Sequence, residues 1–433
     1  MSRLPFHYKP CKFVSLICAI LFLLYGSMNG SAQSIAGGDN PVYRRGESMM
    51  ERVLPAGPQA ASVVRLMDEV GVAQSLGAVE LDVLFYTLEG KELCVPIGVR
   101  YMSHGIRLDE IAGVAGLGWS LYAGGCVTRS VMDMPDEFTS QYMTHRLPSG
   151  SLLSSLEGDV NNTATHSYLE QVCFHRIDAQ LDLYEYNVCG LSGSFVIDGD
   201  EVIQLSGDGV LIGFTRADDG GVGSFTITGP DGVRYTLSER EVGTHNASGG
   251  IDVGYDPTKG EKDIWSATTA WYLTEMTSAG GLERAAFAYK DGQQWDRSIV
   301  SHYQSETHIT GLVDQRSLAS GSSTIVTHYT TKLLTDITLD GFAVHFTYAE
   351  EKTRTLHTDI TEWNFPARLT GVRVTASQGE TLKSITFDTG RDPYDGRVIL
   401  KSITFKGSDA EVSDIYRFAY NTRTSKVSHL QQD

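Results

Sequence analysis

Few residues of this chain combine the type and the spacing that enzymatic chemistry requires. His166 and Glu170 do not complete the His-Glu-x-x-His pattern of a zinc-binding helix, and we expect them in a loop. The segment GLSGS at residues 190–194 lacks the Gly-x-Ser-x-Gly order of a hydrolase nucleophile. The segment GVAGLG at residues 113–118 lacks the strand-to-helix setting of a dinucleotide loop. We therefore assign no catalytic, cofactor-binding or metal-ligating residue, and we expect no cofactor and no enzymatic activity.

Two sets of side chains suggest sugar chemistry, but each has a simpler interpretation. Asp133, Asp136 and Glu137 form a compact acid cluster that can supply one of the two carboxylates of a glycosidase. We interpret these acids as solvated loop charges. Four later tryptophans can stack on sugars, but in alternating strands they are expected in the core: Trp265, Trp271, Trp295 and Trp363.

The composition favours a turn-rich β protein. The 433 residues include 45 glycines and 20 tyrosines, and only 20% are charged. The formal net charge of −18 argues against nucleic acid and anionic lipid surfaces as partners, because both require a basic patch. The length permits a large core or several domains.

The N-terminus resembles a secretory signal at residues 1–32. Arg3, Lys9 and Lys12 precede an apolar run at residues 13–25, and small residues precede the expected cut at Gln33. We therefore expect export to the periplasm, the cell surface or the extracellular space, with no transmembrane span after cleavage. Residues 33–58 are polar and rich in glycine, and they predict a flexible leader.

The stretch at residues 93–129 organises the rest of the chain. Alternating apolar residues predict a strand at residues 95–101, and a run of small residues with one tryptophan follows. The segment GLGWSLYAGG at residues 116–125, followed by VTR at 127–129 and MPDE at 134–137, resembles the signature near the N-terminus of secreted RHS/YD-repeat-type proteins of the Bacteroidetes. Tyr122 stands where those proteins usually have Asn.

We interpret the signature as a folding motif whose residues set backbone geometry and packing. The structural signature comprises Gly116, Gly118, Trp119, Gly124, Gly125 and Arg129. Arg129 either pairs with an acid such as Asp109 or Glu110 or is an ordinary solvated arginine.

The later chain predicts successive β-hairpins. Strand patterns with glycine-containing turns recur at residues 271–289, 333–348, 368–387 and 401–420. An earlier hairpin is expected at residues 224–237. We therefore predict an all-β fold of large twisted antiparallel sheets, either a fragment of the β-shell that the resemblance implies or β-sandwich modules.

The domain organisation that we predict has two folded parts. An N-terminal β domain carries the signature at residues 59–245, and a hairpin repeat region occupies residues 263–433. The segment between them is rich in glycine and aspartate and is expected to be a loop.

Four cysteines remain after removal of the signal. In an exported protein they can form disulfides in three connectivities, of which Cys94–Cys126 with Cys173–Cys189 is the simplest. The alternative is that they are small buried hydrophobic residues.

The resemblance implies an exported, non-enzymatic β-scaffold. Such a protein forms or caps a β-shell and contacts other proteins, for example a downstream RHS/YD-repeat chain or a cell-surface component. Two alternatives stay open. One is a carbohydrate-binding module or glycan hydrolase on a β-rich fold, and the other is a subunit of a polymorphic toxin delivery system, which requires YD repeats downstream.

Overall fold

The chain folds almost entirely into β-strands that are paired in antiparallel order, which confirms the predicted fold class. The computed structural model describes residues 53–54, 80–102, 112–132, 134–138, 144–148, 163–173, 176–207, 209–248, 263–309, 315–349, 367–391, 398–409 and 411–420. The predicted signal peptide and most of the predicted leader lie outside these residues.

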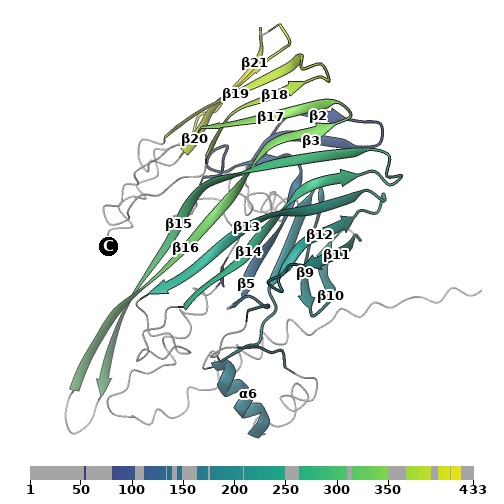
Figure 1. Cartoon of the computed structure of the whole chain (residues 1–433). Coiled ribbons are helices and arrows are strands. Elements are labelled where there is room, and N and C mark those ends of the chain that lie inside the picture. Colours follow the sequence, from purple (N-terminus) through teal and green to yellow (C-terminus); the bar gives the residue numbers. More distant parts are fainter. Residues whose placement is uncertain are drawn as a thin grey trace, which may run out of the picture. The chain divides into compact units, whose positions relative to one another are not determined.

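A large sheet contains most of the strands (Figure 1). Its strands within the described residues are β1 (Val53–Leu54), β5 (Gly125–Met132), β8 (Leu183–Val188), β9 (Leu191–Asp198), β10 (Glu201–Gly207), β11 (Leu211–Arg216), β12 (Val222–Thr228), β13 (Arg234–Ser248), β14 (Asp263–Thr277), β15 (Arg284–Ile309), β16 (Gln315–Leu339), β17 (Phe342–Ala349), β18 (Arg368–Thr375), β19 (Thr381–Arg391), β20 (Val398–Lys406) and β21 (Val412–Arg417). Their order is β10-β9-β8-β5-β14-β13-β16-β17-β18-β19-β20-β21, while β1, β11, β12 and β15 pair beside this path.

Every predicted hairpin of the later chain forms. The strands pair as β14 with β15, β16 with β17, β18 with β19 and β20 with β21. In the second of these hairpins Asp340 and Gly341 have φ of 46° and 81°, and Leu339 pairs with Phe342. Two left-handed residues between paired strands match the right-handed twist of a sheet, which explains the Asp-Gly dipeptide at this turn. The earlier hairpin, β12 with β13, also forms.

A smaller sheet packs against the large one. It consists of β2 (Glu80–Glu89), β3 (Cys94–Met102) and β4 (Trp119–Tyr122), in that order. The Phe85 ring of β2 lies 5.3 Å from the Phe387 ring of β19 and 6.1 Å from the Phe405 ring of β20. Alternation explains this layer, because Val95, Ile97 and Val99 point from β3 into the core and are fully buried.

A second aromatic cluster lies in the same core. Trp271 of β14 is fully buried, and its ring packs 5.0 Å from Phe225 and 5.9 Å from Tyr184. Its indole N–H donates to the carbonyl of Val222 at 3.1 Å, so the one polar atom of the ring is satisfied. Burial of a side chain of this kind contributes about 1.5–3 kcal/mol. The core therefore joins strands that are distant in sequence.

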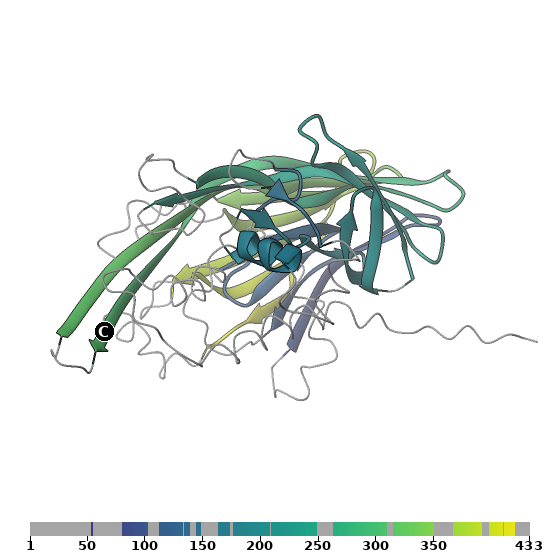
Figure 2. The same ribbon diagram turned by 90° about the horizontal axis from the view of Figure 1, so that it is seen from below.

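Strands β15 and β16 continue beyond their neighbours as a long two-stranded ribbon (Figures 1 and 2). Strand β13 reaches Ser248 and pairs with β14, so strands of both predicted domains belong to one sheet. Residues Glu47–Asp433 form one compact unit.

A short insertion that contains a helix lies between β5 and β8. It contains β6 (Thr144–His145), α6 (Thr163–Cys173) and β7 (Ile177–Asp178). The expectation that His166 and Glu170 lie in a loop is wrong, because both belong to α6, where His166 is exposed. Among the described residues, no helix combines the length and the apolar character needed to cross a membrane.

Candidate functional site

The glycines of the signature let two chain segments approach closely. Gly116 has φ of 117°, and a Cβ placed there would lie 2.9 Å from the backbone nitrogen of Leu400 in β20. Gly118 and Gly124 also have positive φ. Gly125 does not, but a Cβ there would lie 2.2 Å from the carbonyl oxygen of Asn187 in β8. Only glycine satisfies these positions without displacement of a neighbouring strand.

Backbone hydrogen bonds attach this segment to the large sheet. The N–H of Leu117 donates to the carbonyl of Val398 at 2.8 Å, and the N–H of Leu369 donates to the carbonyl of Val114 at 2.8 Å. The loop around Gly116 is thereby bonded to residues at the starts of β18 and β20. The structure thus places the signature where the two sheets meet.

Trp119 anchors the same contact through its side chain. It is 2% exposed, and its indole N–H donates to the Tyr420 hydroxyl at 2.8 Å. Its ring lies 4.6 Å from Phe418 and 5.2 Å from Tyr101. The tryptophan therefore connects β4 with the segment that follows β21, which lies about 300 residues later in the chain.

Arg129 of β5 is the charged member of the signature, and it is fully buried. Its Nε donates to Asp182 at 2.8 Å, and its Nη1 donates to Glu137 at 2.9 Å, while Nη2 contacts both carboxylates. The expected partners Asp109 and Glu110 lie outside the described residues. The alternative of a solvated arginine is wrong, because the side chain has no exposed surface.

The interpretation of Asp136 and Glu137 as solvated loop charges is also wrong. Glu137 forms an ion pair with Arg129 and is 20% exposed, and Asp136 is 18% exposed. Asp133 lies outside the described residues. The two acids are drawn inward because the chain turns back after β5: the N–H of Phe138 donates to the carbonyl of Pro135 at 2.8 Å, and the N–H of Asp136 donates to Asp182 at 3.3 Å.

The acids around Arg129 have shifted pKa values. Burial raises the pKa of Asp182, and the charge of Arg129 opposes that shift. For Glu137, burial is outweighed by the hydrogen bond and charge of Arg129, so its pKa is lowered. Burial and then the charge of Asp182 raise the pKa of Asp136 to about 8. Burial raises these pKa values, and the pKa falls only for Glu137, where the hydrogen bond and charge of Arg129 prevail.

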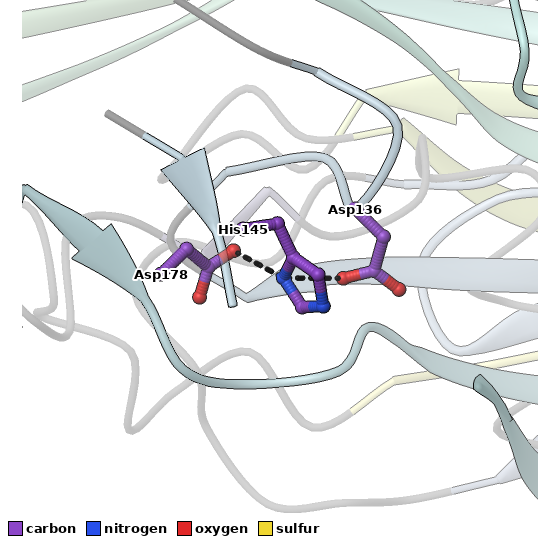
Figure 3. Close-up of side chains that lie close together, drawn as sticks. All are labelled: Asp136, His145 and Asp178. Atoms are coloured by element: carbon purple, nitrogen blue, oxygen red, sulfur yellow. Dashed lines mark hydrogen bonds and ion pairs between the residues drawn. The ribbon is translucent and has the colours of Figure 1, made fainter. Parts of the chain in front are cut away.

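Beside this network lies a cluster of three possible metal ligands, Asp136, His145 and Asp178 (Figure 3). The Nδ1 atom of His145 is 3.5 Å from a carboxylate oxygen of Asp136 and 3.5 Å from one of Asp178. One donor atom of each residue lies within 4.8 Å of the others. In Figure 3 the His145 ring lies between the two carboxylates, and its Nδ1 is joined to one oxygen of each. Hydrogen bonding to Asp178 raises the pKa of His145, with burial opposing.

Strand pairing and backbone hydrogen bonds position these side chains. His145 and Asp178 are direct partners in the parallel pair of β6 and β7. Asp178 accepts from the N–H of Gln180 at 3.0 Å, and Asp136 accepts from the N–H of Asp182 at 3.2 Å. These contacts hold both carboxylates toward the imidazole. One imidazole nitrogen with two carboxylates is a donor set that suits a divalent transition metal.

Sequence reasoning missed this cluster for a physical reason. His145 and Asp178 are 33 residues apart, and α6 lies between them. Ligand spacing can be recognised only when the ligands share one local element, such as a helix turn. A parallel pair of two-residue strands leaves no periodic pattern in the sequence. Asp136 was identified as part of an acid cluster, but its partner His145 was not.

The cysteines do not form the disulfides that the sequence suggested as simplest. Cys94, Cys126 and Cys189 form no disulfide. Cys126 lies in the core of the large sheet, while Cys94 is exposed at the start of β3 in the smaller sheet. Cys189 directs its sulfur to the carbonyl of Gly124 and to the sulfur of Met276. Burial raises the pKa of the Cys189 thiol to about 12.

The two tryptophan candidates whose side chains the structure describes belong to the core. Trp265 is 5% exposed and Trp271 is fully buried, which agrees with the preferred interpretation. The side chain of Trp295 and the whole of Trp363 lie outside what the structure describes.

A scan against protein-family models finds no match for the chain, and a search of curated proteins finds none either.

Proposed function

We propose that this protein is an exported, non-enzymatic β-scaffold that extends or caps a β-shell by pairing with a strand of another polypeptide. The proposal follows the resemblance to the N-terminal region of secreted RHS/YD-repeat-type proteins. The observation that carries it is the edge strand β21. Within the described residues, β21 pairs with β20 on one side.

Strand β21 has the properties of a strand that receives a partner. All six of its residues are exposed, and they include three large apolar side chains: Val412 (52%), Ile415 (43%) and Tyr416 (47%). Unpaired N–H and C=O groups along such an edge are a template for another strand. A neighbouring strand would pair with this backbone edge as β21 pairs with β20.

The tryptophans give this function further support. A sugar-binding protein would display tryptophans in a groove beside paired carboxylates, whereas a scaffold buries them. Trp119, Trp265 and Trp271 are all at most 5% exposed. Among the signature residues, Gly116 packs closely against Leu400 of β20, and Trp119 bonds to Tyr420 beyond β21.

A site-specific photo-crosslinker tests the proposal. Benzoyl-phenylalanine replaces Tyr416 in the full chain, produced in its native cell, and adducts are mapped by mass spectrometry. The matched control carries the same group at Leu282, which is 89% exposed in the turn before β15. We expect position 416 to form adducts with a strand segment of another polypeptide and position 282 to form far fewer.

An edge-blocking substitution makes this test specific. Ile415→Lys places a charge on the open edge and should reduce the adducts from position 416, because a lysine there disfavours strand addition. Equal adducts from positions 416 and 282, or adducts that Ile415→Lys leaves unchanged, would contradict the proposal.

A further inference from the structure

The cluster of Asp136, His145 and Asp178 joins three separate segments of the chain. Asp136 lies in the turn after β5, His145 ends β6, and Asp178 ends β7. A group that bound all three side chains would connect these segments beside the buried Arg129. This cluster is independent of the open edge at β21.

The distances within the cluster suit ligands of a common ion better than hydrogen bonds. Ligands that lie about 2.0–2.2 Å from one metal ion are typically 3–4 Å from one another. The two distances from His145 Nδ1 to carboxylate oxygens are each 3.5 Å. That value is at the outer limit for a nitrogen–oxygen hydrogen bond. A single Nδ1 proton also cannot satisfy two carboxylates, whereas one metal ion can bind all three groups.

The charged groups around the cluster are a second observation that favours a bound cation. Four carboxylates meet here: Asp136, Glu137, Asp178 and Asp182. Arg129 is bonded to Asp182 and Glu137, and the His145 ring contacts Asp136 and Asp178. The Asp178 side chain is 1% exposed. Two carboxyl groups beside one imidazole in a half-buried site supply three ligand atoms for a cation.

Backbone hydrogen bonds also orient the side chains of the cluster, as they do in metal sites. Backbone N–H groups of Gln180 and Asp182 hold the two carboxylates in place. Such secondary contacts orient metal ligands and reduce the cost of binding. Asp136 and His145 are each 18% exposed, so an ion can enter from their side.

From these observations we propose that Asp136, His145 and Asp178 bind one divalent transition-metal ion, with Zn²⁺ as the representative ion, and that this ion clips the turn after β5 to β6 and β7. Three protein ligands leave a coordination position for water. An imidazole ligand disfavours Ca²⁺, which prefers oxygen donors.

Calorimetric titration with Zn²⁺ tests the site. The full chain is purified, stripped with a chelator and titrated with ZnCl₂, and Ca²⁺ is titrated in parallel. We expect one Zn²⁺ per chain at micromolar affinity or tighter, much weaker binding of Ca²⁺, and a higher melting temperature with Zn²⁺, since ligand binding to the folded state stabilises it. Binding of Ca²⁺ as tight as that of Zn²⁺ would overturn the assignment.

Matched variants separate this site from other histidines. His145→Ala should weaken Zn²⁺ binding by more than about tenfold, because it removes a direct ligand and even outer contacts matter at that level. His166→Ala, on the exposed face of α6, should leave the affinity unchanged. Asp136→Asn is a nearly isosteric second variant, whose fold is checked by circular dichroism. Unchanged affinity in a folded His145→Ala or Asp136→Asn protein would overturn the proposal, as would an absence of saturable binding.

Discussion

Replacement of Arg129 by methionine should destabilise the protein strongly. Methionine keeps an unbranched side chain of similar reach but removes the charge. The side chains of Arg129 and Asp182 both have no exposed surface, and Glu137 is 20% exposed. The substitution therefore leaves a buried carboxylate without its cation, which costs about 3–5 kcal/mol. Urea denaturation of the wild-type and variant proteins, with comparison of their m-values, measures this difference in the free energy of unfolding.

The control for this prediction is an arginine–aspartate pair at the surface. Arg100 and Asp82 lie 2.8 Å apart with side chains that are 27% and 40% exposed. Arg100→Met should cost about 0–1 kcal/mol, because solvent screens an exposed pair. The double variant of Arg129→Met with Asp182→Asn should cost less than the sum of its single substitutions, since the fully buried Asp182 carboxylate is no longer left without its cation. Equal losses for Arg129→Met and Arg100→Met would refute the reasoning.

Two further predictions concern other contacts of the fold. Gly116→Ala should cost about 1–3 kcal/mol of stability, because it combines a positive φ with a clash against Leu400. Gly199→Ala should cost less, because φ is positive there but nothing lies within 4 Å of the new Cβ. Urea titrations of the two variants measure the difference. Glu283 accepts from the backbone N–H groups of residues 91–93 at 2.6–2.7 Å, which lowers its pKa below the usual 4.5. The Glu283 carboxylate should therefore stabilise the fold above pH 4.5, and this stabilisation should be lost as the pH falls through its lowered pKa. Glu283→Gln should make the free energy of unfolding depend less on pH on the acid side. An unchanged pH dependence would contradict this.

The hairpins of the later chain could be predicted because their determinants are local. Alternating apolar residues assign each strand to one face of the sheet, and a dipeptide such as Asp340-Gly341 determines the turn between them. The role of the signature was also accessible, because glycines and a tryptophan in one short run favour close packing over chemistry. Its contact with β20, through Gly116 and Leu400, was not predictable from that run.

The candidate metal site illustrates what local patterns miss. Asp136 stands in a recognisable acid run, but the sequence offers no sign that it turns inward. Its environment is made by Asp182, which is 46 residues away, and by His145 and Asp178, which meet through a parallel pair of short strands. Asp136 was expected to be a surface charge, but its burial and its contact with Asp182 make it part of a largely buried network.

The sequence alone determined the fold class and the hairpins, because side-chain alternation and turn chemistry act between residues that are close in the chain. Only the tertiary structure decided that Arg129 pairs with Asp182, that Cys94, Cys126 and Cys189 form no disulfide, and that Asp136, His145 and Asp178 lie close together. These contacts depend on the register of strands from distant parts of the chain, and register in a large sheet is set by the packing of the whole core.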